Sequence, residues 1–261
     1  MIELPAMNLS MAGELAAAYK SGSQRARVVT ESWGESNLYC PNCSSPKLTW
    51  LEPGHPASDY SCPKCKFWFQ LKSQKSRLGD SITDGAYEAM MDAIKRDETP
   101  SFYFMQYELA TWRVRNLLLV PSFAFPPSAI IKRKPLSSTA RRAGWVGCNF
   151  ALNRIPADAR IAVVTESRVT PEAEVRKQFR HVKPLKDIPI QMRGWTLDVL
   201  NAIRRLGKTE FITADAYAFT RELEKLHPDN RHVKDKIRQQ LQVLRDAGLL
   251  LHIERGIWRL P

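Results

Sequence analysis

The chain of 261 residues is long enough for one large domain or two modest ones. Its hydrophobic share of 44% and charged share of 25% are those of a globular protein, which excludes a wholly disordered chain. Lys and Arg outnumber Asp and Glu by 39 to 27, and the net charge of +12 favours a polyanionic partner. The sequence contains no transmembrane run and no signal-peptide pattern, so we expect a cytoplasmic protein.

The first part of the chain alternates helical and strand-like patterns around a cysteine-rich stretch. Apolar residues at helical spacing near the N-terminus predict one helix, and the pattern AYEAMMDAIK predicts another. Thr83 or Asp84 is the expected N-cap of that second helix, and Pro121 is expected to end a strand. The expected elements are a helix over 8–36 broken near 20–23, short strands within 38–72, a helix over 86–95, and strands over 102–107, 114–120 and 161–165.

The last part of the chain predicts a compact unit of three helices and a strand hairpin, which follows a polar linker with Pro184 and Pro189. The third helix is the clearest, because apolar residues recur at spacings of 4, 4 and 3 from Val233 to Leu244 and Gly248 follows as a C-cap. The expected elements are a helix over 195–206, a strand at 211–212, a helix after the N-cap Thr213 with Ala216, Tyr217 and Leu223, a helix over 233–244, and strands over 249–253 and 257–260. This order predicts a winged helix.

Four of the five cysteines form two Cys-x-x-Cys pairs. Cys40 and Cys43 are separated from Cys62 and Cys65 by 18 residues, a spacing typical of zinc sites with four thiolate ligands. Because four ligands complete the tetrahedron, we expect a structural Zn²⁺ that contributes to local folding. Two disulfides or free core thiols are the alternatives. The fifth, Cys148, is expected to be a small buried residue.

An acidic, an amide and a basic side chain flank the second cysteine pair. Asp59 precedes the pair, and Gln70 and Lys72 follow it on a strand-like run, where a separation of two places them on one face. An Asp oxygen, a second oxygen ligand and the Leu71 carbonyl suit Mg²⁺, and a lysine can orient the attacking water. This arrangement resembles the PD-(D/E)xK nuclease motif, with Gln in place of the usual acid. Glu31 or Glu52 is a possible source of the missing carboxylate.

Ordered stretches along nearly the whole chain carry a broader resemblance. They are 19–21 through 32–33, the two cysteine pairs, 84–87, 133–136, 139–145, 193–196 and 236–241. They resemble the methyl-directed restriction endonucleases of the DpnI type. The resemblance implies an α/β fold with a PD-(D/E)xK mixed sheet flanked by helices, a four-cysteine zinc site at one edge of the sheet, and a C-terminal winged helix. We place the catalytic domain in residues 1–184 and the winged-helix DNA-binding domain in residues 185–261.

The same resemblance implies an activity. It is cleavage of double-stranded DNA at GATC when the adenine carries an N6-methyl group, with catalytic Mg²⁺ and structural Zn²⁺ as cofactors. Asp59 and Lys72 fall on the catalytic positions of the family. Gln70 falls where the family has Glu, which puts the reaction rate, or the activity itself, in question.

A basic segment lies between the catalytic motif and the C-terminal unit. It contains Lys132, Arg133, Lys134, Arg141 and Arg142 and no acid, which suits contact with phosphate oxygens. Trp145 follows and offers a flat apolar face to a methyl group in the major groove. The resemblance places Trp145 in a methyl-sensing loop. A solvated charge run and a core tryptophan are the alternatives.

The third C-terminal helix is expected to enter the major groove with its N-terminal half. The expected DNA-binding side chains there and on the wing are Arg231, His232, Lys234, Lys236, Arg238 and Arg255. A winged helix used for protein contacts is the alternative. The five histidines show no metal spacing, and His55 is expected in a surface loop.

Three functions compete on these observations. The first is a methyl-directed type II restriction endonuclease that acts as a monomer on adenine-methylated DNA, without an obligate protein partner or a membrane. The second is a catalytically degenerate reader of methyladenine or a regulator, which Gln70 favours. The third is an RNA- or ribosome-associated zinc-ribbon protein, which does not explain the winged helix.

Overall fold

The structure is a computed structural model that describes residues 7–52 and 58–261. His55, expected in a surface loop, lies outside these residues. The described chain falls into two units, each assembled from segments that are distant in sequence. The first unit holds the chain through Gly79 with Thr99–Ser122 and Arg160–Arg180, and the second holds Asp80–Glu98, Phe123–Ala159 and His181–Pro261.

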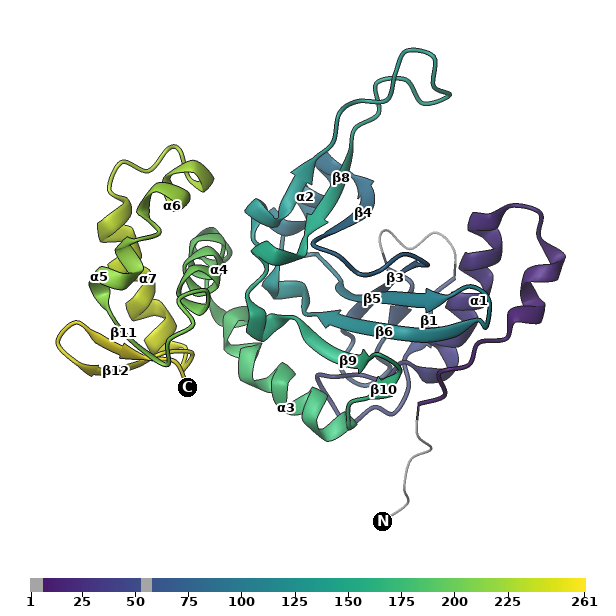
Figure 1. The fold of residues 1–261 in the computed structure, drawn as a ribbon, viewed down its shortest axis with the longest axis horizontal. Helices are drawn as coiled ribbons and strands as arrows, with labels where there is room; N and C mark the ends of the chain where they lie inside the picture. The colour runs from purple at the N-terminus through teal and green to yellow at the C-terminus, as the bar shows by residue number, and fades with distance from the viewer. Residues whose placement is uncertain (1–6, 53–57) are drawn as a thin grey trace. The chain divides into compact units, whose positions relative to one another are not determined.

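A mixed β-sheet is the framework of the first unit (Figure 1). Its strands lie in the order β1-β2-β3-β5-β6-β9-β10, in which β3 and β5 are parallel and the other neighbours are antiparallel. β5 is buried along nearly its whole length, as expected of a central strand. The bounds are β1 (Thr49–Trp50), β2 (Tyr60–Ser61), β3 (Trp68–Gln74), β5 (Ser101–Glu108), β6 (Arg113–Val120), β9 (Ile161–Thr165) and β10 (Arg168–Val169). The strands predicted at 102–107, 114–120 and 161–165 are therefore confirmed.

The helix predicted over 8–36 is only partly right. The α-helix α1 covers Gly22–Asn37, and a short 3₁₀ helix, η1, covers Gly13–Ala18. Residues before η1 are extended, because the Leu9 carbonyl accepts the Val114 N–H and the Met11 N–H donates to the Trp112 carbonyl. This tertiary pairing overrides the helical spacing of the apolar residues.

The helix α1 packs on the face of β3 that carries Leu71 and Ser73. The Thr30 and Ser73 hydroxyls lie 3.1 Å apart, and the Tyr60 hydroxyl donates to the Glu31 carbonyl at 2.9 Å. A Cβ added at Gly34 would lie 2.3 Å from the Tyr60 oxygen, so glycine is needed for this close approach. The contact holds α1 beside the β2–β3 hairpin.

A small antiparallel sheet opens the second unit, with β4 (Ser81–Ala86), β8 (Gly147–Ala151) and β7 (Ile130–Lys132) in that order. The helix α2 (Tyr87–Lys95) follows β4, which confirms the predicted helix, but its N-cap is Ala86. Thr83 and Asp84 do not cap it, because they lie in β4, where Thr83 pairs with Asn149 of β8.

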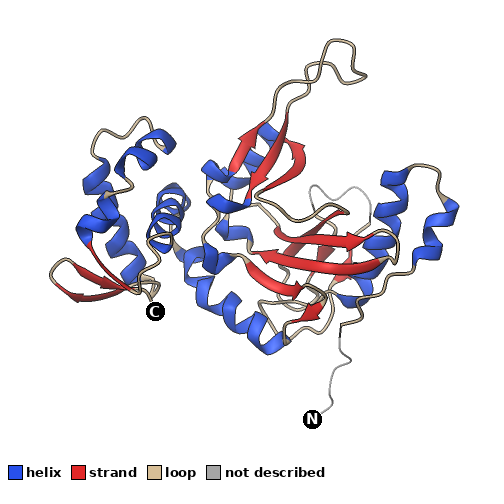
Figure 2. Cartoon of the chain, viewed as in Figure 1, coloured by secondary structure: helices blue, strands red, loops and turns tan. Residues whose placement is uncertain are grey.

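The C-terminal part of the second unit has the predicted winged-helix order of elements (Figure 2). Its sheet has the order β11-β13-β12. The bounds are α4 (Ile190–Arg204), β11 (Glu210–Ile212), α5 (Thr213–Tyr217), α6 (Thr220–Leu226), α7 (Val233–Asp246), β12 (Leu251–Glu254) and β13 (Ile257–Arg259). The second predicted helix is divided into α5 and α6, and Ile212 rather than Thr213 is the cap residue of α5. The Asp215 carboxylate accepts the Ile212 N–H at 3.0 Å, which closes this cap.

One helix was missed from the sequence. α3 covers Glu172–Val182, within the stretch expected to be a polar linker, and a 3₁₀ turn over Lys183–Asp187 follows it. Val175, Phe179 and Val182 are buried, and their spacing of 4 and 3 is the helical signal that could have revealed it. Further 3₁₀ turns cover Ser122–Ala124, Pro127–Ala129, Leu152–Arg154 and Ala157–Ala159. Within residues 7–52 and 58–261, no helix combines the length and apolarity that a membrane span requires.

The predicted fold class is confirmed: an α/β protein with a mixed sheet, flanking helices, a tetra-cysteine cluster and a C-terminal helix-turn-helix unit.

Candidate functional site

The two cysteine pairs converge into one cluster. The sulfur atoms of Cys40, Cys43, Cys62 and Cys65 all lie within 4.8 Å of one another. The sulfur atoms of Cys40 and Cys65 and those of Cys43 and Cys62 are 3.5 Å apart, which is far longer than a disulfide bond. A tetrahedron of thiolates around zinc has sulfur separations of about 3.8 Å, given Zn–S bonds near 2.3 Å. The cluster could therefore hold a zinc ion, and none of the five described cysteines forms a disulfide.

The second pair forms the turn that joins β2 to β3, as the sequence predicts. The Cys62 N–H donates to the Phe67 carbonyl at 2.8 Å, and the Lys66 N–H donates to the Cys62 carbonyl at 3.0 Å. Burial favours the neutral thiol of Cys62, but the backbone N–H groups of Cys65 and Lys64 outweigh it and lower its pKa to about 7. In the first pair, by contrast, burial raises the pKa of Cys40 and of Cys43. Metals bind the deprotonated thiol, so a bound cation would displace the protons of these two thiols.

Arg176 of α3 supports the first pair and was not found from the sequence. Its Nε donates to the carbonyls of Cys40 at 3.2 Å and Cys43 at 3.0 Å, and Nη2 donates to the Ser45 carbonyl at 3.3 Å. The guanidinium also lies 5.0 Å from the centre of the Tyr39 ring and forms an ion pair with Glu172 at 2.7 Å. One side chain thus orients three carbonyls of the loop that carries two of the thiols.

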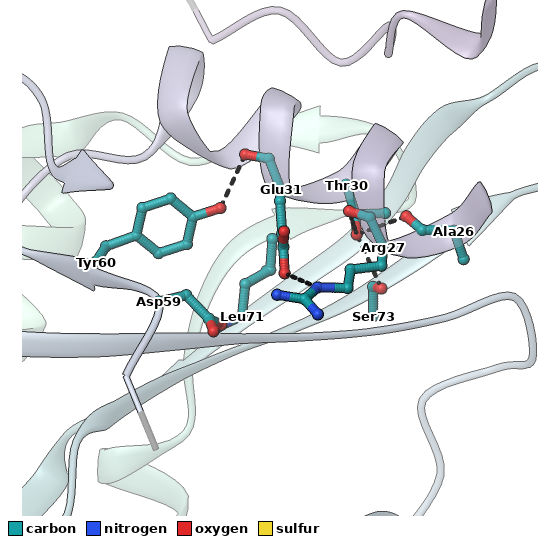
Figure 3. A network of polar contacts seen from close by, with 8 residues as sticks. All are labelled: Ala26, Arg27, Thr30, Glu31, Asp59, Tyr60, Leu71 and Ser73. Atoms are coloured by element: carbon teal, nitrogen blue, oxygen red, sulfur yellow. Dashed lines mark hydrogen bonds and ion pairs between the residues drawn. The ribbon is translucent and has the colours of Figure 1, made fainter. Parts of the chain in front are cut away.

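The Asp59 carboxylate lies at the edge of β3, immediately before β2 begins. Its Oδ2 accepts the Leu71 N–H at 2.8 Å, as Figure 3 shows. Burial raises the pKa of Asp59, the Leu71 N–H lowers it, and the Glu31 carboxylate raises it further, while Lys72 lowers it. The net effect is a raised pKa. The Leu71 N–H and the Lys72 ammonium group are both close enough to the Asp59 carboxylate to lower its pKa, although burial outweighs them.

Gln70 and Lys72 occupy alternate positions on β3 and are both half-buried, whereas Phe69 and Leu71 are buried. Alternation along a strand places Gln70 and Lys72 on one face and the apolar pair on the other. The Leu71 carbonyl points to the same strand edge as its N–H, toward Asp59. The strand thus offers the Leu71 backbone and the Lys72 ammonium group near the Asp59 carboxylate. Gln70 adds an amide oxygen on the face of the strand that carries Lys72.

Glu31 brings a second carboxylate close to Asp59. It lies on α1, its carboxylate raises the pKa of Asp59, and Figure 3 shows it between the helix and β3. Its Oε1 accepts the Arg27 Nε–H at 2.7 Å, and its side chain is 23% exposed. Glu52, the other candidate, is exposed and is not among the groups that shift the Asp59 pKa.

The basic segment forms a long projecting loop between β7 and β8 (Figure 1). Lys132, Arg133, Lys134, Arg141 and Arg142 are all exposed there. Trp145 is half-buried at the base of the loop, and the Arg142 guanidinium lies 4.4 Å from its ring centre. A Cβ added at Gly147 would lie 2.8 Å from the Trp145 ring, so the ring packs closely against the Gly147 backbone.

The DNA-binding residues expected in the C-terminal unit divide between two hollows. Arg231 and His232 line a hollow of about 670 Å³ with Trp195 and His227. Arg238 and Arg255 line another of about 530 Å³, beside α5 and the β12–β13 hairpin. Lys234 lies 5.6 Å from the centre of the Tyr217 ring, which lines the second hollow, and Lys236 is half-buried on α7.

Several residues around the second hollow were not expected from the sequence, namely Thr213, Tyr217, Gln242, Arg245, His252 and Trp258. The available signal was on α7, where Arg238, Gln242 and Arg245 recur at spacings of 4 and 3 on the exposed side of an amphipathic helix.

Comparison with known protein families assigns both parts of the chain. Residues 7–188 match the model of the Dam-replacing family named DpnI, and residues 191–260 match the model of the Dam-replacing HTH domain. The first match alone covers more than half of the chain, and the second coincides with α4 to β13. An HTH domain supports DNA binding, and a restriction-type family supports a role in a restriction system. On these matches, the chain belongs to the Dam-replacing family of the DpnI type and carries its C-terminal HTH domain.

Proposed function

We propose that this protein is a methyl-directed type II restriction endonuclease that cleaves double-stranded DNA at GATC when the adenine carries an N6-methyl group. One observation carries the nuclease part of the proposal: the Asp59 carboxylate, the Leu71 backbone and Lys72 group at the edge of β3 in a chain of this family. The GATC and methyladenine specificity rests on the resemblance stated above.

The residues at this edge suit Mg²⁺, because carboxylate, amide and carbonyl oxygens are the ligands that a hard cation prefers. Asp59, Glu31, Gln70 and the Leu71 carbonyl would hold the ion. When bound, Mg²⁺ would stabilise negative charge on the phosphoryl oxygens. The Lys72 ammonium would orient the attacking water and stabilise the same developing charge. A tetra-cysteine Zn²⁺ would hold the β2–β3 turn and so fix Asp59 relative to Lys72.

We assign cleavage to residues 1–184 and a second reading of the DNA to residues 185–261. We expect phosphate contacts from the exposed basic side chains of the β7–β8 loop and from Lys132 at the end of β7, namely Lys132, Arg133, Lys134, Arg141 and Arg142. Trp145 would contact the methyl group, with Arg142 moving from its ring face to a phosphate. Arg231, His232, Lys234, Lys236, Arg238 and Arg255 would contact DNA from α7 and the wing.

A catalytically degenerate reader of methyladenine is the second candidate function. Gln70 favours it, because an amide oxygen carries no charge and binds Mg²⁺ less strongly than a carboxylate does.

A plasmid digest separates these candidates. The purified protein is incubated with Mg²⁺ and two preparations of one plasmid, only one of which is methylated at GATC adenines. We expect discrete fragments from the methylated plasmid alone. Absence of cleavage, with tight binding to the methylated form in a gel shift, would favour the degenerate reader. Cleavage of both preparations would refute the methyl dependence and the role of Trp145.

Substitutions on β3 test the chemistry. Lys72→Ala should abolish cleavage and leave DNA binding largely intact, and a parallel loss of binding would refute its catalytic role. Gln70→Glu should preserve or raise the activity because it restores the charge. A large loss in that variant would show that the amide itself is needed.

A further inference from the structure

A third hollow, of about 620 Å³, lies within the first unit at the end of β3. Gln74, the last residue of β3, lines it together with Lys75 and Ser76, which follow the strand. The rest of its wall comes from α1, β5 and the loop between β5 and β6. Binding sites for small molecules have volumes of about 300–1,000 Å³. Because Lys72 lies two residues before Gln74, the hollow and the candidate catalytic edge share one strand.

Two stacked rings form the apolar part of the wall. The centroids of the Tyr107 and Trp112 rings lie 5.4 Å apart, and their planes differ by 4°. Trp112 has a φ of 46°, in the left-handed region that is unfavourable for so large a residue, and its carbonyl accepts the Met11 N–H at 2.8 Å. The fold thus holds the indole in place against its backbone preference. Leu109, which is 47% exposed, adds an aliphatic surface.

The Tyr107 side chain also brings a hydrogen-bond donor to the hollow. Tyr107 is only 4% exposed, and its hydroxyl forms no hydrogen bond with any residue of 7–52 or 58–261. Burial raises the pKa of Tyr107, so the hydroxyl keeps its proton. A nearly buried donor is costly to leave unpaired, and an acceptor inside the hollow would remove that cost.

The charge of the hollow is positive. Lys75 and Arg25 line it and are both exposed, and none of the described residues that line it is acidic. Lys75 forms no ion pair within the described chain. The Arg25 Nε donates to the Ala16 carbonyl at 3.2 Å, and the terminal nitrogens of the guanidinium can donate to an occupant. Two cations, a hydroxyl donor and an apolar wall together suit a phosphate that carries an organic group.

We propose that this hollow holds a sugar-phosphate unit of the DNA strand, a short distance from the phosphodiester that is cut. The proposal rests on the proposed function, in which Lys72 faces the scissile phosphate. A β-strand rises about 3.3 Å per residue, and B-DNA rises about 3.4 Å per nucleotide. The two residues from Lys72 to Gln74, or three to Lys75, therefore correspond to about two to three nucleotides.

Each group of the hollow then has a partner on the DNA. Lys75 and Arg25 would contact the phosphate, and the Tyr107 hydroxyl would donate to one of its oxygens. Leu109 and Trp112 would contact the deoxyribose. Lys75 is thus a positioning residue, which fixes the DNA strand along β3 without touching the reacting atoms. A free nucleotide presents the same sugar and phosphate, so the test includes that source.

The test removes one phosphate charge at a time from the DNA. Each duplex is methylated at its GATC adenines and carries one neutral methylphosphonate, at a position up to about four nucleotides from GATC. The full chain with Lys72→Ala, which should not cleave, is the background protein. Kd is measured by fluorescence anisotropy. We expect methylphosphonate at one or two adjacent positions to weaken binding about three- to fivefold, as for loss of an exposed charged contact.

Lys75→Ala in this background should weaken binding by the same factor, and methylphosphonate at those positions should then have no further effect. The slope of log Kd against log salt concentration should fall by about 0.9, the value for one phosphate contact. Tyr107→Phe, which keeps the ring, should weaken binding about twofold or more. Lys47→Ala is the matched control, because Lys47 is an exposed lysine of the first unit that does not line the hollow. It should keep the full methylphosphonate effect.

Two results overturn the inference: no methylphosphonate position that weakens binding by the background protein, or an equal methylphosphonate effect in Lys75→Ala and Lys47→Ala. Calorimetry with deoxyadenosine monophosphate tests the other source. Lys75-dependent binding of this nucleotide, without a methylphosphonate effect, would assign the hollow to a free nucleotide and overturn DNA as its occupant.

Failure of the proposed function would be recognised separately. It would appear as equal binding of methylated and unmethylated duplexes, or as absence of cleavage by the unsubstituted protein. Neither of these results depends on Lys75 or on a single flanking phosphate.

Discussion

Arg176 illustrates how one side chain outside a cysteine cluster organises the loop that carries two of its thiols. Its guanidinium donates to three carbonyls around Cys40 and Cys43, and its own side chain is 18% exposed. Sequence patterns identify ligands by spacing, but this contact joins positions more than 130 apart in the chain. It could not have been predicted without the fold.

Arg176→Ala should accelerate the loss of zinc, because the loop carbonyls would lose their donors and the thiols their orientation. Partners of this kind are worth about tenfold or more in metal affinity. Zinc transfer to a chromogenic chelator measures the effect on the zinc-loaded protein. Lys177→Ala, at an exposed neighbouring position of α3, is the control, and equal transfer rates in the two variants would contradict the prediction.

We propose Glu31 as the substitute for the acid missing at Gln70, because its carboxylate is close enough to Asp59 to raise the pKa of Asp59. Glu31→Gln should weaken Mn²⁺ binding in the absence of DNA by at least about tenfold, because a charged oxygen ligand is replaced by a neutral one. Titration calorimetry measures this without reference to cleavage. Glu52→Gln is the matched control. An equal or larger loss in the control would assign the missing carboxylate to Glu52 instead.

The junction between α1 and the β2–β3 hairpin depends on Gly34. Gly34→Ala would place a Cβ 2.3 Å from the Tyr60 oxygen and 2.9 Å from its ring carbon, so the helix must move away. We expect a loss of about 1–3 kcal/mol in the free energy of unfolding and reduced cleavage, since α1 carries Glu31. Urea unfolding measures the first effect.

Gly22→Ala is the control on the same helix, because an added Cβ there has no neighbour within 4 Å. It should be neutral or stabilising by about 0.4–1 kcal/mol through the unfolded chain. Similar losses in both variants would show that the Gly34 contact is not what holds the helix.

Elements with strong local patterns were predictable, and those decided by distant contacts were not. α7 and the strands β5, β6 and β9 follow their apolar periodicity. The extended segment before η1 and the strand that contains Thr83 and Asp84 depend on pairing with β6 and β8. In the candidate site, the sequence spacing of the two Cys-x-x-Cys pairs predicted the cysteine cluster, and the position of Asp59 just before the second pair predicted its place beside that pair. The proximity of Glu31 to Asp59, the contacts of Arg176 and the place of Tyr217 beside the second hollow depend on the packing of α1, α3 and α5, respectively.

The second unit joins segments that the two family matches separate. Arg193 of α4 is 5% exposed and donates to the Asp97 carboxylate and to the carbonyls of Lys186 and Ile188. Ser128 donates to the buried Asp198 at 2.5 Å, and the Asn201 amide donates to the Asn153 carbonyl at 3.1 Å. The start of the HTH domain is thus hydrogen-bonded to residues far upstream in the chain. Asp97 follows α2, Ser128 precedes β7 and Asn153 precedes β9.

Arg193→Ala should lower the free energy of unfolding of the second unit by about 2–4 kcal/mol, because buried carbonyls and a carboxylate lose their charged donor. Arg205→Ala removes an arginine from an exposed pair with Glu222 and should cost no more than about 1 kcal/mol. Urea unfolding monitored by circular dichroism compares the two. A loss no larger than that of Arg205→Ala would mean that the upstream contact is not important for stability.

The turn between β2 and β3 has a consequence for how this family can vary. The same short turn carries Cys62 and Cys65 and separates Asp59 from Lys72. One inserted or deleted residue on its β3 side would shift the strand by one position and move Gln70 and Lys72 to the opposite face of the sheet. The thiols would also lose their geometry. If Asp59 and Lys72 act together as proposed, insertions and deletions that an ordinary hairpin tolerates should be selected against here. The number of residues between Asp59 and Lys72 should then vary much less than the identity of those residues.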